Sequence, residues 1–133
     1  MDSANATDHA AAGLAILLWA SEPEAPHRLA TPFFHAAAAA ALDLPVEVYF
    51  TARSVLLLQP GVAASLRASG HPKTVYDAMQ EAVQHGAVFH ACSDALHAHG
   101  LDAATLIPEC TRRGGAVQFI GRASDLRWRT LVF

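Results

Sequence analysis

The stretch GAVFHACSDALHAHG, residues 86–100, indicates how this chain folds. Residues 86–91 form a short apolar run that is typical of a strand, and residues 93–99 have the character of a helix. Gly100 follows at a position where helices often end. A strand that leads directly into a helix is the repeating unit of α/β proteins, so we expect this unit to recur along the chain.

Strand and helix patterns alternate on both sides of this stretch. The apolar run at residues 13–20 is continuous rather than alternating, as in strands that are buried on both faces of a parallel sheet. Further strands are predicted at residues 45–50, 106–107 and 127–133, and helices at residues 33–42, 74–85 and 116–122. The sequence therefore predicts one α/β domain over residues 13–133, with a mainly parallel sheet between helices, after a frayed tail at residues 1–12.

The composition narrows the class of protein. At 133 residues, 53% hydrophobic and 16% charged, the chain is one globular domain, and the low charge suggests that another subunit covers some apolar surface. A net charge of −3 argues against direct nucleic-acid binding. No apolar stretch is long enough for a membrane helix, and two cysteines make no disulfide framework. We expect a soluble cytoplasmic protein, acting neither on nucleic acid nor at a membrane.

Cys92 is the candidate reactive residue. It lies between the predicted strand at 86–91 and the predicted helix from Ser93, and open α/β sheets bind ligands beyond the carboxyl ends of their strands. Unpaired N–H groups and the helix dipole at such a position favour the nucleophilic thiolate. The alternative is that Cys92 is a small buried apolar residue, as free cysteines often are.

Other candidate residues surround this position in the sequence or follow the strand predicted at 106–107. Cys110 is either a resolving partner or an uninvolved thiol. Gly114 and Gly115, at a helix start, suit an anion, and two arginines precede them. The histidines lack the spacing of a zinc site, so we expect no metal and no cofactor. The predicted site-lining residues are His90, Ser93, Asp94, Cys110, Arg112, Arg113, Gly114 and Gly115.

Four segments resemble the DsrE/DsrF-like family in their order and spacing. They are GLAILLWASEP, VYFTARSVLLLQPGVAASL, GAVFHACSDALHAHGL and GGAVQFIGRASDLRWRTLVF, which together reach from Gly13 to Phe133. The resemblance implies a three-layer, flavodoxin-like α/β fold with a five-stranded sheet, assembly into trimers or hexamers, and sulfur chemistry. It also implies that Cys92 carries sulfur as a persulfide, because many members keep their functional cysteine there.

Three functional hypotheses stay open at this point. In the first, the protein is a sulfur carrier or sulfurtransferase-like enzyme that takes sulfane sulfur from a donor protein onto Cys92 and yields it to an acceptor. In the second, it is a non-enzymatic oligomeric module that binds a partner or a small anion, with Cys92 merely packed. In the third, Cys92 and Cys110 form a redox-sensitive pair, which requires close Cα atoms.

Overall fold

In the computed structural model, which describes residues 11–68 and 70–133, five strands form one parallel sheet. In sheet order they are β4 (Cys110–Arg113), β3 (Val88–Ala91), β2 (Val46–Phe50), β1 (Gly13–Leu18) and β5 (Trp128–Val132). The predicted parallel sheet is confirmed, and all four strand pairs in these residues are parallel. The frayed tail predicted for residues 1–12 lies, up to residue 10, outside the described residues.

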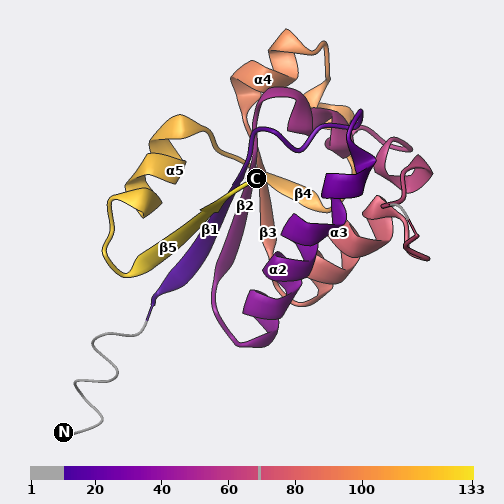
Figure 1. Cartoon of the computed structure of the whole chain (residues 1–133). Coiled ribbons are helices and arrows are strands. Elements are labelled where there is room, and N and C mark those ends of the chain that lie inside the picture. The colour runs from indigo at the N-terminus through magenta and orange to yellow at the C-terminus, as the bar shows by residue number, and fades with distance from the viewer. Residues whose placement is uncertain (1–10, 69) are drawn as a thin grey trace, which may run out of the picture.

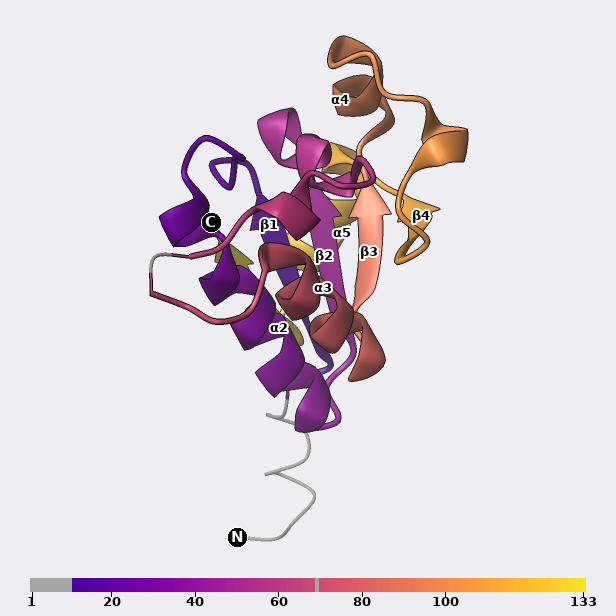
Figure 2. The ribbon, with the colours of Figure 1, turned by 90° about the vertical axis from the view of Figure 1, so that its right-hand side faces the viewer.

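Helices cover both faces of the sheet, which confirms the three-layer, flavodoxin-like arrangement (Figure 1). The helices α2 (Ala30–Ala41) and α3 (Val75–Gln84) pack side by side on one face, and α5 (Ala116–Ala123) lies on the other. The short helix α4 (Ser93–Ala98) stands beyond the carboxyl end of β3 (Figure 2). The layers thus leave the carboxyl edge of the sheet to loops and helix starts.

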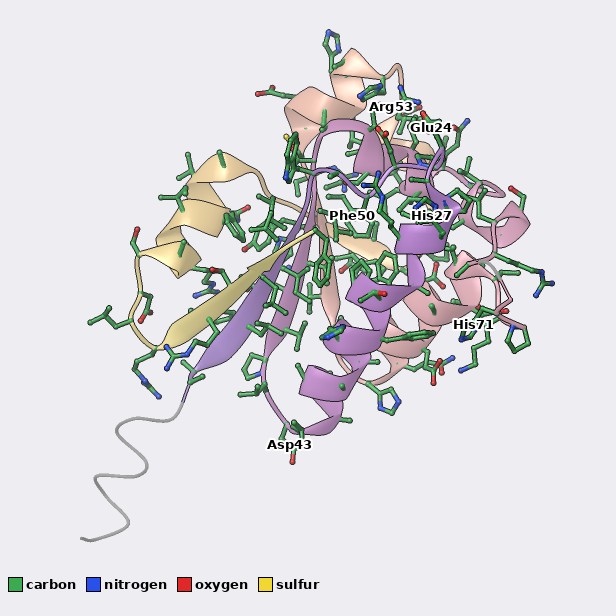
Figure 3. All side chains as sticks on the ribbon, viewed as in Figure 1. Glu24, His27, Asp43, Phe50, Arg53 and His71 are labelled. Carbon is green, nitrogen blue, oxygen red and sulfur yellow. The ribbon has the colours of Figure 1, made fainter. Side chains whose placement is uncertain are left out.

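The larger core lies between the sheet and the layer formed by α2 and α3. Phe33 of α2, Phe50 of β2 and Phe89 of β3 are fully buried there. The ring centroid of Phe33 lies 6.0 Å from that of Phe50 and 5.8 Å from that of Phe89, and the centroids of Phe50 and Phe89 are 5.0 Å apart. Figure 3 shows Phe50 inside this part of the molecule. The same figure shows Arg53 close to Glu24, an ion pair that joins the segment after β2 to the loop after β1.

Local sequence explains where the main helices form. The alanines at 36–41 make α2 a strong helix former, and they let it approach the sheet closely. At the start of α3, the Thr74 side chain accepts from the Asp77 N–H at 3.0 Å, and the Asp77 carboxylate accepts from the Thr74 N–H at 2.9 Å. This reciprocal pair is a capping box, so the helix predicted at residues 74–85 begins as its sequence indicates.

The fourth strand was predicted in the wrong place. Residues 106–107 are not a strand: Ile107 is buried because it packs beneath the segment after β2, and its N–H donates to the carbonyl of Leu58 at 2.9 Å. The strand is β4, which begins at Cys110 and pairs with β3. Arg112 and Arg113, expected to follow the fourth strand, therefore belong to it: β4 is an exposed edge strand whose polar sequence carries no apolar pattern.

The connections that follow β3 and β4 diverge to opposite faces of the sheet. After β3, Ala95 and Leu96 of α4 join the larger core, whereas after β4, Phe119 of α5 joins the small core on the other face. The chain then passes behind the sheet to place β5 beside β1. In open α/β sheets, ligands bind at such a divergence, beyond the carboxyl ends of the strands.

Candidate functional site

Cys92 stands at this divergence, where β3 ends and α4 begins. It is the N-cap residue of α4, and its backbone N–H donates to the carbonyl of Phe50, at the end of β2, over 3.0 Å. This bond extends the pairing of β2 and β3 by one residue, so it holds Cys92 at the carboxyl edge of the sheet. The thiol is partly buried and free, which leaves its sulfur available for chemistry.

Gly114 and Gly115 lie beside Cys92, at the end of β4. The Gly114 N–H donates to the carbonyl of Ala91 at 3.0 Å, which continues the pairing of β3 and β4 in the same way. Gly115 is the N-cap residue of α5. A Cβ atom added to Gly115 would lie 3.6 Å from the Sγ atom of Cys92, so the backbone approaches the sulfur closely here. The glycine pair thus brings the start of α5 next to the thiol.

These segments and Cys92 line an open cavity of about 540 Å³. The cavity brings together six of the nine residues that the sequence predicted for the site. Its lining residues are Thr51, Cys92, Ser93, Asp94, Arg113, Gly114, Gly115, Ala116, Val117 and Gln118. We call this the Cys92 cavity. It contains residues that follow β2, β3 and β4, as expected where parallel strands end at one edge.

Three predicted residues lie outside the Cys92 cavity: His90, Cys110 and Arg112. Arg112 is exposed on β4, in register with His90. Cys110 is in register with Phe89, three residues before Cys92, so it lies about 10 Å back along the strand direction at ~3.3 Å per residue. A disulfide between the two cysteines needs Cα atoms within ~7 Å, so the redox pair would require backbone movement.

Cys110 is also a poor nucleophile. Its Sγ atom contacts the carbonyl oxygens of Phe89 at 3.9 Å and of Arg112 at 3.8 Å. Burial raises the pKa of this thiol, an effect that the nearby Arg113 only partly offsets. The thiolate that sulfur chemistry needs is therefore disfavoured at Cys110.

The charges around Cys92 come from side chains and from the start of a helix. Arg113 lines the cavity, and its guanidinium donates to the carbonyls of Ala103 at 2.8 Å and of Arg112 at 3.2 Å, which fixes the cation in place. Asp94 is exposed at the rim. The first turn of α5 forms another wall, and within the described residues no side chain caps its N–H groups. Such a turn carries partial positive charge, which suits an anion or a thiolate.

A polar cluster lies under the other side of α5. Arg122 donates two hydrogen bonds to the Glu47 carboxylate, each 2.9 Å long, and its guanidinium stacks 4.1 Å from the Trp128 ring centroid. The Tyr49 hydroxyl donates to the same carboxylate at 2.7 Å. Burial alone would raise the pKa of Glu47, but the bonds from Arg122 and Tyr49 outweigh it and lower the pKa. Glu47 therefore stays ionised and anchors α5 to β2.

His90 belongs to this cluster rather than to the Cys92 cavity. Its ring stacks on Tyr49 with a centroid distance of 4.6 Å, and only 8% of the residue is exposed. Neither ring nitrogen has a hydrogen-bond partner among the described residues, although the backbone of Arg113 is nearby. Burial lowers the pKa of His90 more than Glu47 raises it, so the ring is neutral at pH 7. His90, which the sequence predicted as a site-lining residue, therefore does not line the Cys92 cavity.

Sequence reasoning missed four residues of the Cys92 cavity: Thr51, Ala116, Val117 and Gln118. Thr51 directly follows β2, so the argument that placed Cys92 after β3 applies to it equally. The other three form the first turn of the helix that Gly114 and Gly115 introduce. Both signals were present in the sequence.

Two further observations concern metals and membranes. Among residues 11–68 and 70–133, no three His, Cys, Asp or Glu side chains gather closely enough to hold a metal ion. Within the same ranges, every helix is too short or too polar to cross a bilayer.

Comparison with known proteins agrees with the fold. Residues 15–133 match the DsrE/DsrF-like family. The chain belongs to this family. Members of the DsrE/DsrF-like family are generally linked to sulfur relay. The matched residues include β2, β3 and β4, which the lining residues of the Cys92 cavity follow.

Solved structures share the fold of this DsrE/DsrF-like chain at low sequence identity. The ychN protein from E. coli has a TM-score of 0.70 at 13% identity, over 91% of this chain and 99% of that one. The protein BT1422 from Bacteroides thetaiotaomicron has a TM-score of 0.63 at 17% identity, over 100% and 99%. MTH1491 from Methanobacterium thermoautotrophicum has a TM-score of 0.60 at 20% identity, over 90% and 97%. No curated protein matches the sequence significantly.

Proposed function

We propose that this protein is a sulfur carrier that holds sulfane sulfur as a persulfide on Cys92. The observation that carries the proposal is the position of Cys92 in the wall of an open cavity at the carboxyl edge of the sheet, against the start of α5. The family's link to sulfur relay supports the same chemistry. Cys110, held among backbone carbonyls with a raised pKa, is the less suitable thiol.

The reaction is a pair of thiol exchanges. The Cys92 thiolate attacks the outer sulfur of a donor persulfide, a new S–S bond forms to Cys92, and the donor leaves as a thiolate. An acceptor thiolate then attacks the outer sulfur of the Cys92 persulfide. The outer sulfur passes to the acceptor, and Cys92 leaves as a thiolate again. No net oxidation occurs. The first turn of α5 and Arg113 line the same cavity as Cys92, so their positive charge suits the sulfur anions that form in both steps.

Intact mass measurement tests this proposal. The protein is incubated with a sulfane-sulfur donor, and we expect a product heavier by one sulfur atom in the wild type and in Cys110→Ser. Cys92→Ser should show no such product. Absence of the product in the wild type, or its equal formation in Cys92→Ser, would contradict the proposal.

The second candidate function is a non-enzymatic module that binds a small anion. Its supporting observation is that Gly114, Gly115, Arg113 and the uncapped first turn of α5 line one cavity. Here Cys92 is only packed, so its labelling by a neutral thiol reagent at pH 7 should be much slower than that of a free cysteine. Labelling at a comparable rate favours the sulfur carrier.

We propose in addition that the protein is a homo-oligomer, as a trimer or hexamer. The supporting surface is the sheet edge at β5, where Leu126, Leu131 and Val132 are 92%, 36% and 55% exposed. Apolar side chains beside an uncovered strand edge fit a second copy of the chain. Light scattering should give three or six chains, and Leu126→Glu should weaken assembly while Leu42→Glu, just after α2, should not. A monomeric wild type contradicts this proposal.

The proposed chemistry fits a cytoplasmic location, because a free thiol persists where cysteines stay reduced. The donor and acceptor are then other proteins or small thiols of that compartment. With a net charge of −3, the chain offers no basic excess for direct contact with nucleic acid.

A further inference from the structure

A second cavity adjoins the Cys92 cavity, between the start of α5 and the ends of β1 and β2. Its volume is about 230 Å³. Its side walls are apolar or aromatic: Leu17 of β1, Tyr49 of β2, and Phe119 and Ile120 of α5. None of the described residues that line it is charged, whereas charged side chains do line the Cys92 cavity. We call it the apolar cavity.

The two cavities share a wall. Thr51, Gly114, Gly115 and Ala116 line both of them. Because a Cβ on Gly115 would lie 3.6 Å from the Cys92 sulfur, this wall is thin beside the thiol. The apolar cavity therefore lies directly beside the cavity that Cys92 lines.

We propose that the apolar cavity selects the thiols and persulfides that react with Cys92. The preferred partner carries an uncharged apolar group, up to the size of a phenyl ring, a few bonds from its sulfur. This inference rests on the proposed function, because it names the substrate class of the same thiol.

Size and polarity both support this substrate class. A cavity of about 150 Å³ with aliphatic and aromatic walls holds benzene in another protein, so 230 Å³ accommodates a phenyl ring. A charged group would lose its water there and find no opposite charge among the described lining residues. Ionic low-molecular-weight thiols should consequently gain nothing from the apolar cavity.

Methanethiosulfonate reagents test the selection without any sulfane sulfur. The Cys92 thiolate attacks the thiol sulfur of the reagent, a mixed disulfide forms, and methanesulfinate leaves. Rates for benzyl, methyl and 2-sulfonatoethyl reagents are measured by mass in a Cys110→Ser background and divided by the rates for free cysteine. We expect the benzyl-to-methyl ratio to exceed that of free cysteine at least about tenfold, since burial of a ring is strongly favourable. The sulfonate should show no gain.

Two matched variants locate the effect. Ile120 is 57% exposed on α5, so Ile120→Trp fills the apolar cavity without disturbing the core. It should lower the benzyl-to-methyl ratio toward the value for free cysteine. Leu42, the C-cap residue of α2, is 77% exposed and lines neither cavity, so it provides the control, and Leu42→Trp should keep the wild-type ratio. Equal ratios in all three proteins would overturn the assignment of selectivity to this cavity.

The outcomes also separate this inference from the proposed function. A wild-type ratio equal to that of free cysteine overturns the inference, even when Cys92 forms a persulfide. A raised ratio without persulfide formation overturns the proposed function instead, and no labelling by any reagent overturns both. Activated peptides with a cysteine next to phenylalanine or next to aspartate identify where the apolar group comes from. A faster reaction of the phenylalanine peptide indicates a partner protein. A faster reaction confined to the small reagents indicates a small thiol.

Discussion

The close packing around Gly114 gives a quantitative test of the site's geometry. A Cβ atom at this position would clash with Oε1 of Gln118 and would lie 2.9 Å from Nδ1 of His90. The Gln118 side chain is exposed and can turn away, but His90 is buried against Tyr49 and cannot. Forcing a methyl group into such a place costs about 1–3 kcal/mol, so Gly114→Ala should lower the free energy of unfolding by this amount.

Thermal unfolding measures the effect, since 1 kcal/mol shifts Tm by about 4 °C for a domain of this size. Gly114→Ala should therefore melt roughly 4–12 °C lower. A double-mutant cycle assigns the cause: Gly114→Ala with His90→Ala should show a coupling of about 1 kcal/mol or more, and Gly114→Ala with Gln118→Ala almost none. An unchanged Tm, or coupling to Gln118 alone, would refute the reasoning.

Three further predictions concern neighbouring groups. Gly115→Ala should fold normally, because its Cβ would meet the Cys92 sulfur at an ordinary 3.6 Å, but it should slow Cys92 labelling measured by mass. Because the pKa of His90 is lowered in the folded protein, its ring takes up a proton more readily in the unfolded chain. The free energy of unfolding, measured in urea, should therefore fall as the pH drops below about 6.5. The fall should be smaller in His90→Phe. The lowered pKa of Glu47 predicts a further loss of stability below about pH 4.5. Glu47→Gln should remove this loss and cost about 1 kcal/mol or less at pH 7, because 40% of the Arg122 side chain is in contact with solvent.

The fold was predictable where buried elements require runs of apolar residues in the sequence. β1, β2 and β3 are central strands of the sheet, so their residues are apolar. These apolar runs predicted strands at residues 13–20, 45–50 and 86–91. β4 is an edge strand with the sequence CTRR, and its residues are mostly exposed although they pair with β3. Its sequence therefore shows no periodicity of apolar residues from which a strand could be predicted. The apolar pair at 106–107 indicated burial correctly but not a strand, because loops also bury residues against the core.

The site was predictable where it depends on local order along the chain. Cys92, Ser93, Asp94, Gly114 and Gly115 follow strands directly, so the parallel sheet brings them to one edge.

The polar cluster under α5 depends instead on long-range pairing. Glu47 and Arg122 are 75 positions apart, and no spacing rule connects them. His90 lies in this polar cluster, outside the Cys92 cavity, for a related reason. Its environment depends on Tyr49 and on the crossing of α5, neither of which its own strand reveals.

The central claim, that Cys92 carries the sulfur, is tested most directly by locating the sulfur in the loaded protein. After exposure to a sulfane-sulfur donor, the persulfide is trapped by alkylation and the protein is digested and sequenced by mass spectrometry. The account predicts the extra sulfur on the peptide that contains Cys92, and its loss from that peptide when a thiol acceptor is added. Extra sulfur on Cys110, or on neither cysteine, would contradict it.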